Sequence, residues 1–566
     1  MRSKLLSKKA LDLILFKPAL YFHTLRYLKL GQIYWRIWYR FSRPCVDPSP
    51  RPAVRPVSGH WVPPARRRQS LEDCDKFSFL NETGHLSELG WDGPQREKLW
   101  RYNQHYFDDL NSVDAEARSE WHLALVKRWI KENTPGQGTG WEPYPTSLRI
   151  VNWIKWYLGG HSLHDECLQS LAIQTRWLSR RIEWHLLGNH LLANAKAMVF
   201  AGLCFKGSEA QKWLDIGLDI IAKELPEQVL PDGGNFERSP MYHAIFLEDI
   251  LDLINLAGAY PGVVGKEQVR EWRATARKML RWLEGMCHPD GEIAFFNDAA
   301  IGIAPSPEKI KTYANCLGIS INHVDTLSGS ITISRFADSG YIRLDAMNAC
   351  AFLDVAPIGP DYLPGHAHAD TLSFELSLYG ERVLVNGGTS QYGNELVRLE
   401  ERGTAAHNTV VVNNENSSEV WSGFRVARRA YPLGIEIAQG DETALVTCEH
   451  DGFMRLPGRP VHKRSWQFFP GKLVVKDRIE GDFKSGIARF HFHPDLYVNS
   501  IDRYRYLLRL PNSRQDIQIF VLHGVACIEQ SFFAPEFGIR LNSQCLAIHF
   551  ESNNNIAVEI SWSINE

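Results

Sequence analysis

Hydrophobic side chains recur at spacings of three and four through the first half of the chain, which is the pattern of amphipathic helices. The pattern predicts helices over residues 118–132, 145–158, 163–186, 189–205, 211–224, 240–258 and 266–286. Loops that contain Gly and Pro separate these runs. Helices in such antiparallel succession indicate a helical toroid or bundle with a groove at one end.

The hydrophobic period changes to two beyond about residue 325, as in Ile331-Thr332-Ile333-Ser334 and in residues 372–378. Turn signals such as Tyr379-Gly380-Glu381 and Asn413-Asn414 recur between short apolar runs, and helical runs disappear. The second half is therefore expected to be an all-β domain, built as a layered antiparallel sandwich.

A segment rich in Pro and Arg, residues 44–69, marks a linker or an extended strap near the N-terminus. At 566 residues the chain is too long for one hydrophobic core. We therefore divide it into a basic arm with its linker (residues 1–70), a helical domain (71–320) and a β domain (321–566).

The N-terminal arm, residues 1–43, carries ten Lys or Arg against one acid, Asp12, interleaved with aromatic and aliphatic residues. It contains no apolar stretch long enough for a signal-peptide core or a membrane span, so no export signal is evident. A basic amphipathic segment could lie on an anionic membrane surface. The alternative is a helical arm that packs on its own domain through Tyr27, Ile33, Trp35 and Trp38.

Composition narrows the class of protein. A formal net charge of −2 excludes a nucleic-acid binder that works through a bulk positive field. Ten dispersed cysteines without a C-x-x-C pair are expected to be free thiols. The 18 Trp residues could fill cores or stack on sugar rings.

Three histidines form the best candidate for chemistry. The chain reads Gly365-His366-Ala367-His368-Ala369-Asp370, and His407 follows in Thr404-Ala405-Ala406-His407-Asn408-Thr409. If the first segment is extended, His366 and His368 point to the same face, because successive side chains of a strand alternate.

The helical half offers further candidates. Asn189 is a plausible N-cap in Gly188-Asn189-His190. Ser239-Pro240 is a helix start signal, which places Tyr242 in the first turn, where the helix dipole favours a phenolate. Glu237 and Asp298 could form the carboxylate pair of a glycoside hydrolase, although capping or surface roles are the simpler explanation.

Aromatic and polar loops supply candidate sugar contacts. One is Trp141-Glu142-Pro143-Tyr144-Pro145, and the other is Tyr102-Asn103-Gln104-His105-Tyr106. From these loops and from the segment before the Ser239 cap we take as candidate substrate-binding residues Trp141, Tyr144, His105, Arg238 and Glu237.

Taken in order, Gly188-Asn189-His190, residues 238–243, Gly365–Asp370 and Thr404–Thr409 resemble the heparinase II/III family of polysaccharide lyases. The resemblance covers roughly residues 95–560. It implies an N-terminal incomplete (α/α) toroid, a C-terminal antiparallel β-sandwich and an active site in the cleft between them, so the fold class is α+β and multidomain.

The family chemistry is β-elimination next to a uronic acid, which needs no organic cofactor. The resemblance implies that Tyr242 is the base or acid and His366 its partner. It further implies that Asn189, with His190, neutralises the substrate carboxylate. The substrate would be an acidic polysaccharide, and no nucleic-acid partner is expected.

Some family members hold a structural zinc, and the matching positions here are His368, Asn386 and His407. An Asp of the family has become Asn386, and a neutral amide is a poorer zinc ligand than a carboxylate. The metal-free alternative is that the two histidines are hydrogen-bonded core residues that support His366.

Three functions remain open from the sequence. The leading hypothesis is a lyase of acidic polysaccharides in the bacterial cell envelope or periplasm, with a cytoplasmic location as the alternative because no export signal is evident. The second is a polysaccharide-binding or export/assembly protein that has lost turnover. The third is the hydrolase that uses Glu237 and Asp298.

Overall fold

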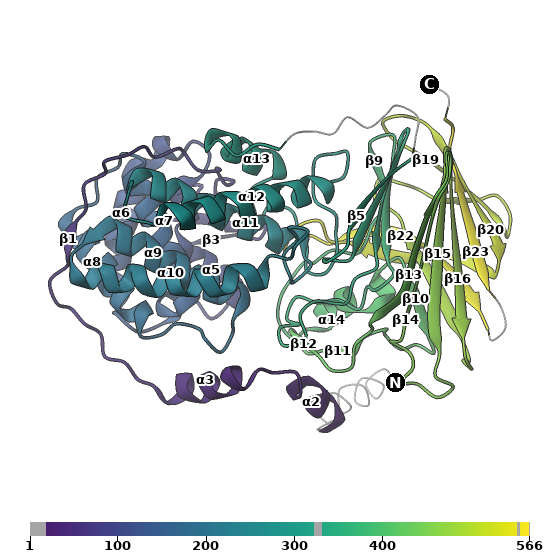
Figure 1. Cartoon of the computed structure of the whole chain (residues 1–566), viewed down its shortest axis with the longest axis horizontal. Helices are drawn as coiled ribbons and strands as arrows, with labels where there is room; N and C mark the ends of the chain where they lie inside the picture. The colour runs from purple at the N-terminus through teal and green to yellow at the C-terminus, as the bar shows by residue number, and fades with distance from the viewer. Residues whose placement is uncertain (1–17, 322–330, 552–554, 565–566) are drawn as a thin grey trace.

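The protein has a helical body followed by a β-rich body, as a computed structural model that describes residues 18–321, 331–551 and 555–564 shows (Figure 1). Helices fill the first half of the chain, and antiparallel strands fill the second. The toroid and the sandwich expected from the hydrophobic periods are therefore confirmed. Among the described residues, no helix combines the length and the apolar content needed to cross a bilayer.

The N-terminal segment lies along one side of both bodies (Figure 1). It forms α2 (Pro18–Leu25) and α3 (Leu30–Phe41), and an extended strap follows whose strand β1 (Ala53–Val54) pairs antiparallel with β4 (Phe205–Lys206). The strap is anchored on the toroid, where Arg51 pairs with Asp165 at 2.6 Å. The first part of the predicted basic arm, residues 1–17, lies outside the described residues.

The toroid consists of α-helices, short 3₁₀ helices and one hairpin. The helices are α4 (Leu86–Leu89), α5 (Lys98–Tyr106), α6 (Ser119–Glu132), α7 (Pro143–Leu158), α8 (Asp165–Ser179), α9 (Gly188–Cys204), α10 (Ser208–Gln228), α11 (Pro240–Ala259), α12 (Lys266–Gly285) and α13 (Pro307–Cys316). The 3₁₀ helices are η1 (Asp108–Asn111), η2 (Ala115–Arg118) and η3 (Thr139–Trp141), and the hairpin pairs β2 (Lys76–Phe79) with β3 (Glu82–His85).

All the predicted helices are present, but α8 ends at Ser179 and not near residue 186. The backbone N–H of Glu183 donates to the Asn194 side chain on α9 at 2.8 Å, which holds residues 180–187 in a turn. Helix α9 is buried on nearly all sides and packs against α7, α10 and α11. A helix without a polar face belongs at the centre of a helical body.

The β body contains three main antiparallel sheets. Their orders are β5-β6-β7-β8-β9, β10-β17-β22-β21 and β13-β14-β15-β16-β23-β20-β19-β18. The strands of the first sheet are β5 (Thr332–Phe336), β6 (Tyr341–Ala346), β7 (Ala349–Asp354), β8 (Phe374–Leu378) and β9 (Glu381–Leu384). Those of the second are β10 (Val410–Val412), β17 (Gly486–His491), β22 (Leu541–Phe550) and β21 (Val525–Phe533).

The third sheet is formed by β13 (Pro432–Gln439), β14 (Ala444–His450), β15 (Val461–Phe469), β16 (Lys472–Glu480), β23 (Ile556–Ser561), β20 (Asp516–His523), β19 (Arg505–Arg509) and β18 (Asn499–Ser500). The remaining elements are α14 (Leu396–Arg402), η4 (Thr404–Ala406) and a hairpin of β11 (Val420–Trp421) and β12 (Arg425–Val426). Side chains alternate between buried and partly exposed along β15, the period of two that predicted this sheet.

Aromatic packing joins the two bodies. Trp282 of α12 lies 6.0 Å from Tyr341 of β6 between ring centroids, and Phe296 lies 5.0 Å from the same tyrosine. These residues belong to one buried cluster with Phe352 of β7. Because the interface is apolar and closely packed, it holds the two bodies in one arrangement and defines the space between them.

Candidate functional site

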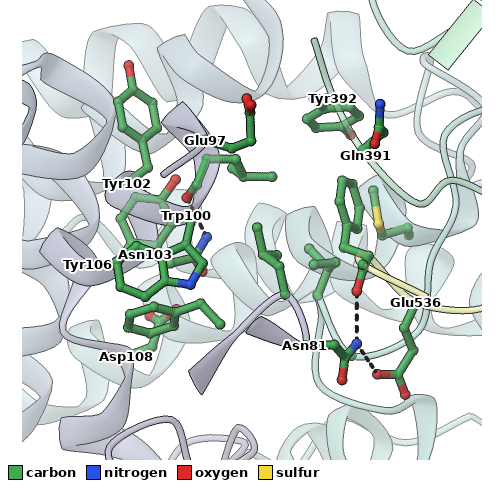
Figure 2. Close-up of a pocket in the computed structure, with 18 of the residues that line it drawn as sticks. Asn81, Glu97, Trp100, Tyr102, Asn103, Tyr106, Asp108, Gln391, Tyr392 and Glu536 are labelled. Atoms are coloured by element: carbon green, nitrogen blue, oxygen red, sulfur yellow. Dashed lines mark hydrogen bonds between the residues drawn. The ribbon is translucent and has the colours of Figure 1, made fainter. Parts of the chain in front are cut away.

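A cavity of about 620 Å³ lies between the toroid and the β body. Figure 2 shows its two walls: Tyr102, Asn103 and Tyr106 on one side, and Gln391 and Tyr392 on the other. This volume is within the range of small-molecule and sugar sites, and an aromatic lining suits the apolar faces of sugar rings. Since both domains contribute walls, the cavity is the cleft expected between them.

Helix periodicity decides which residues of the predicted sugar-binding loops reach the cavity. Residues 102–106 form the end of helix α5, not a loop. Tyr102 and Tyr106, four residues apart, line the cavity. His105 points the other way, is fully buried, and accepts a hydrogen bond from Trp129 Nε1 at 3.0 Å. The substrate-binding role predicted for His105 is therefore wrong.

The second predicted loop divides in the same way. Trp141 lies in η3 and packs in the core, with its ring 5.6 Å from that of Trp129. It does not line the cavity, so its predicted sugar contact is wrong. Tyr144 lies in the first turn of α7 and does line the cavity.

The predicted substrate contacts Arg238 and Glu237 lie behind the cavity wall. Arg238 has a left-handed backbone (φ 59°), and its Nε donates to the Ser339 carbonyl of the β body at 3.0 Å. It therefore joins the two bodies and does not face substrate. Glu237 is almost fully buried and pairs with His366. Both assignments as direct substrate contacts are wrong, although Glu237 positions a cavity residue.

Tyr242 occupies the predicted first turn of α11. Ser239 is the N-cap, and its Oγ accepts the Tyr242 backbone N–H at 3.1 Å. The Tyr242 hydroxyl lies 2.7 Å from the Tyr392 hydroxyl in the cavity wall. Burial, reinforced by Tyr392, raises the pKa of the Tyr242 phenol well above its usual value. The expected stabilisation of a phenolate by the helix dipole is thus outweighed, and the phenol keeps its proton at neutral pH.

His366 stacks on Tyr242, with ring centroids 3.8 Å apart and planes inclined by 16°. Its Nδ1 lies 2.5 Å from Glu237 Oε2. A carboxylate accepts hydrogen bonds, so Nδ1 is the donor in this contact, and in a neutral ring the lone pair is then on Nε2. His366 also lines the cavity. An imidazole and a phenol are therefore in contact in one wall of the cavity.

Asn189 is presented to the cavity by a strained turn. Leu187 (φ 64°) and Gly188 (φ 54°) both have left-handed backbone, and the N-cap of α9 is Leu187, so the N-cap role predicted for Asn189 is wrong. The Asn189 amide lines the cavity and makes no hydrogen bond to the part of the chain that the structure describes. Left-handed non-glycine residues often mark functional turns. The amide is thus available to a ligand.

His190 completes this corner of the cavity. Its Nδ1 lies 3.2 Å from Glu183 Oε2, and its ring centroid lies 4.5 Å from that of Tyr144. The carboxylate and the phenol ring together fix the orientation of the imidazole. His190 and Tyr144 both line the cavity beside Asn189.

The cations of the cavity wall already have partners. Arg68 pairs with Glu536 at 3.1 Å, and Lys98 pairs with Glu142 at 2.8 Å. Figure 2 also shows Asn81 donating to Glu536 and to the Phe537 carbonyl. Neutral donors such as the Asn189 amide therefore remain the free groups for an anionic substituent.

His368 faces away from His366, contrary to the shared face expected for an extended strand. Residues 365–370 form an irregular loop, and His368 is fully buried. Its Nε2 lies 2.8 Å from Asp298 Oδ1, and its Nδ1 lies 3.2 Å from His407 Nε2. Burial lowers the pKa of His368 to about 4 and that of His407 to about 3. Both rings are therefore neutral.

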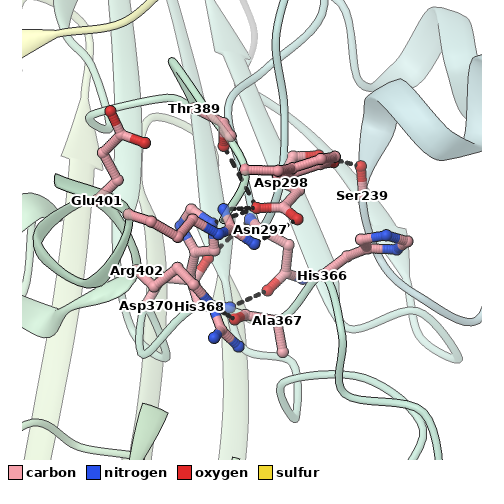
Figure 3. A network of polar contacts seen from close by, with 12 residues as sticks. Ser239, Asn297, Asp298, His366, Ala367, His368, Asp370, Thr389, Glu401 and Arg402 are labelled. Atoms are coloured by element: carbon pink, nitrogen blue, oxygen red, sulfur yellow. Dashed lines mark hydrogen bonds and ion pairs between the residues drawn. The ribbon is translucent and has the colours of Figure 1, made fainter. Parts of the chain in front are cut away.

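Asp298 is the centre of a buried network behind the cavity wall that contains His366 (Figure 3). Arg398 donates to both carboxylate oxygens, one of them at 2.8 Å. Burial alone would raise the pKa of Asp298, but Arg398 and His368 outweigh it and hold that pKa far below the usual range. The Asp298 backbone N–H donates to the His366 carbonyl at 2.9 Å, so the network fixes the loop that carries His366.

The predicted zinc ligands do not converge. The Asn386 amide donates to the Phe295 carbonyl at 2.9 Å and accepts the Asn408 backbone N–H at 3.2 Å, so both of its ends are used. His368 and His407 alone face one another. The one cluster of three metal-ligating side chains among the described residues, Cys527, Glu529 and His549, has no member in the cavity wall. The predicted donor set therefore fits a zinc ion poorly.

The two carboxylates predicted for a hydrolase are both paired with other side chains. Asp298 is fully buried against Arg398, and Glu237 is paired with His366. Neither residue lines the cavity. Since a hydrolytic pair must reach the scissile bond from two sides, this alternative is not supported by the geometry.

Tyr392 is a site residue that the sequence did not reveal. It follows the glycines of Asn386-Gly387-Gly388-Thr389, and Arg398 lies 4.9 Å from its ring centroid. Gly388 has φ 73°, and a Cβ there would lie 2.1 Å from the Ala534 carbonyl oxygen, so only glycine fits this turn. The paired glycines were the available signal, because they mark a tight turn that redirects the chain toward the cavity.

Family models match both bodies of the chain. Residues 95–317 match the model described as Heparinase II/III N-terminus, and residues 330–563 match the one described as Heparinase II/III-like, C-terminal. The chain belongs to the heparinase II/III family. The resemblance inferred from the Asn189, Tyr242, His366 and His407 segments is thereby confirmed.

Individual relatives agree with this assignment. A heparin-sulfate lyase of Bacteroides stercoris is 28% identical over 446 residues, which are 70% of this chain and 64% of the relative. A heparin-sulfate lyase of Pedobacter heparinus is 26% identical over 250 residues, 40% of this chain and 36% of the relative. The chain thus matches less than two thirds of the length of either relative.

Solved structures confirm the fold of this heparinase II/III family member. A crystal structure of heparinase III superposes with a TM-score of 0.65 at 18% identity, covering 84% of this chain and 78% of the other. At that identity the likeness establishes the shared toroid and sandwich.

Proposed function

We propose that the chain is a polysaccharide lyase that cleaves an acidic, uronic-acid-containing polysaccharide by β-elimination. The observation that carries the proposal is the stacked pair of Tyr242 and His366 in the cleft, 3.8 Å apart between centroids. Membership in the heparinase II/III family and relatives named heparin-sulfate lyases support the reaction class.

His366 is the base of the proposed reaction. Its Nε2 takes the proton from C5 of the uronic acid, while Glu237 accepts the Nδ1–H bond and stabilises the imidazolium that forms. The electrons of the broken C5–H bond form the C4=C5 double bond, and the C4–O4 bond breaks. Glu237 is a positioning residue, because it acts on the substrate only through His366.

Tyr242 is the acid. Because burial keeps its phenol protonated, it can transfer a proton to the departing O4 oxygen. Tyr392, at 2.7 Å, is placed to return a proton to Tyr242 after each turnover. After the product leaves, His366 releases the C5 proton to solvent and solvent restores a proton to Tyr392, so the protons balance over one turnover.

Asn189 neutralises the substrate carboxylate by donating its free amide N–H. Withdrawal of charge from the carboxylate makes the C5 proton more acidic and stabilises the enolate-like intermediate. A preorganised donor of this kind is worth about 2.7–4 kcal/mol of transition-state stabilisation in enzymes that use an oxyanion hole. His190, oriented by Glu183, supports this corner.

Absorbance of the new C4=C5 double bond tests the proposal. The protein is incubated with a panel of uronic-acid polymers that includes heparan sulfate, and the ultraviolet signal of an unsaturated uronide is followed. We expect a signal with wild type and none with Tyr242→Phe. The matched control is Tyr260→Phe, which removes a buried phenol at the opposite end of α11 and should keep full activity.

Other outcomes would replace the proposal. New reducing ends without ultraviolet absorbance would indicate hydrolysis. Saturable polysaccharide binding with neither signal would indicate a binding or assembly protein.

A further inference from the structure

Helix α3 carries a continuous apolar stripe on its outer face. The stripe consists of Leu30, Ile33, Tyr34, Ile37, Trp38 and Phe41, which are between 42% and 84% exposed. Their spacing of three and four residues places all of them on one side of the helix. A stripe of this kind normally faces a core, and here it faces solvent.

The opposite face of α3 is already docked on the toroid. Trp35 stacks on Trp184 with ring centroids 6.1 Å apart, and Tyr39 lies 4.4 Å from the His185 ring. Gln32 is buried and donates to the Tyr362 carbonyl at 3.2 Å. The packed-arm alternative from the sequence is therefore correct for Trp35 and for Tyr27, whose ring centroid lies 3.8 Å from the Arg429 guanidinium, whereas Ile33 and Trp38 point outward. The stripe is not needed to hold the helix in place.

Helix α2 extends the exposed surface. Phe22 and Leu25 are 64% and 51% exposed, while Trp421 of β11 donates to Thr24 Oγ1 at 3.0 Å and fixes the helix. In all, 9 of the 24 exposed large hydrophobic residues in the described chain lie between residues 21 and 41. A monomer rarely exposes so dense an apolar patch without a partner.

The charge around the stripe is positive. Residues 18–46 contain five Lys or Arg and no Asp or Glu. Arg36, Arg40 and Arg43 are exposed and form no ion pair within the described residues. Arg36 and Arg40, four residues apart, lie along one edge of the stripe.

We propose that the arm binds the surface of an anionic lipid bilayer, with α3 parallel to the membrane plane. The stripe enters the boundary between headgroups and acyl chains, Tyr34 and Trp38 sit at headgroup depth, and the arginines meet anionic headgroups. A bilayer supplies apolar depth and negative charge along the whole length of a helix, which matches both features of α3. The absence of a spanning helix among the described residues is compatible with surface binding.

Vesicle cosedimentation tests the proposal with the full chain. The probes are vesicles of phosphatidylcholine alone and of phosphatidylcholine with phosphatidylglycerol in equal parts. We expect the wild type to bind the anionic vesicles. The stripe variant Ile37→Ser/Trp38→Ser/Phe41→Ser should bind at least tenfold more weakly, and Arg36→Gln/Arg40→Gln should lose roughly fivefold for each charge removed.

A matched control separates the stripe from general loss of exposed apolar surface. Ile501, Leu522 and Val525 of the β body are 56%, 50% and 74% exposed, close to the 57%, 55% and 78% of Ile37, Trp38 and Phe41. Their triple replacement by Ser should leave vesicle binding unchanged. Circular dichroism and lyase turnover, which should be equal in all variants, verify folding.

Three results would overturn the proposal. One is a wild type that does not sediment with anionic vesicles. Another is a stripe variant that binds as well as wild type. The third is a concentration-dependent dimer, measured by light scattering, that is lost in the stripe variant while the wild type does not bind vesicles. In that case the stripe would bind a second copy of the chain.

Discussion

Replacement of Glu237 by Gln tests whether Glu237 prepares His366 for its proposed role as the base. The Glu237 carboxylate lies 2.5 Å from His366 Nδ1, and its side chain is only 3% exposed. Gln keeps the shape but removes the charge, so the imidazolium that forms during proton abstraction loses its counter-charge. The Gln amide can also donate to Nδ1, which would move the ring proton onto Nε2, the atom that must be free.

The expected cost follows from the kind of hydrogen bond that is lost. A buried hydrogen bond to a charged group contributes about 1.5–3 kcal/mol. At about 1.36 kcal/mol per factor of ten, kcat should fall by about 10- to 150-fold. KM should change little, because Glu237 does not line the cavity and the substrate does not touch it. The assay is the initial rate of ultraviolet absorbance over a range of substrate concentrations.

Glu375→Gln is the matched control, because it makes the same chemical change at another buried Glu–His pair. Glu375 Oε2 lies 2.9 Å from His288 Nε2, and neither side chain is exposed or in the cavity wall. We expect this variant to keep its kcat while its thermal stability changes. The proposed role of Glu237 in supporting His366 is refuted if Glu237→Gln retains kcat within a factor of two, or if both variants lose the same activity.

Arg398→Met should destabilise the protein by about 3–5 kcal/mol in chemical denaturation, because it leaves the Asp298 carboxylate buried without its cation; an unchanged midpoint would contradict this. The folded state should also lose stability in acid. His368 and His407 have pKa values of about 4 and 3, below the ordinary 6.5, so the stability that they contribute is complete above pH 6.5 and is lost as the pH falls toward 4 and 3. Each of these histidines should lower the free energy of unfolding by about 1.4 kcal/mol per pH unit in that window. A Tm that stays constant from pH 7 to 4 in scanning calorimetry would refute the assignment. Since the Asn386 amide is bonded at both ends, we expect chelator treatment to leave Tm unchanged and metal analysis to find no stoichiometric zinc at this site.

Much of the architecture could be predicted because it depends on local periodicity. Helices α6 to α12 and the change to strands near residue 330 follow directly from spacings of 3.6 and 2. Ser239-Pro240 predicted the start of α11, since an N-cap is a hydrogen bond between residues close together in the sequence. The motifs around Asn189, Tyr242 and His366 identified the family, because the short segments that carry them are recognisable without knowledge of their spatial arrangement.

The errors arose where a side chain's direction depends on its three-dimensional surroundings. His105 and Trp141 are in the expected segments, but their positions on helical turns direct them into the core. The dipole argument for Tyr242 was local and correct in sign, yet burial by the second domain reverses the outcome. His366 and His368 differ because a loop, not a strand, carries them.

The sequence by itself determined the two bodies and their order, and it supplied the candidate residues for proton transfer. It could do so because helical and strand periods, caps and the family motifs are properties of short segments. Only the tertiary structure decided that Glu237 bonds to His366, that the Tyr392 hydroxyl contacts Tyr242, and that Arg398 forms an ion pair with Asp298. These pairs are separated by 100 to 150 residues along the chain, and no local rule specifies which distant side chain fills a given buried position.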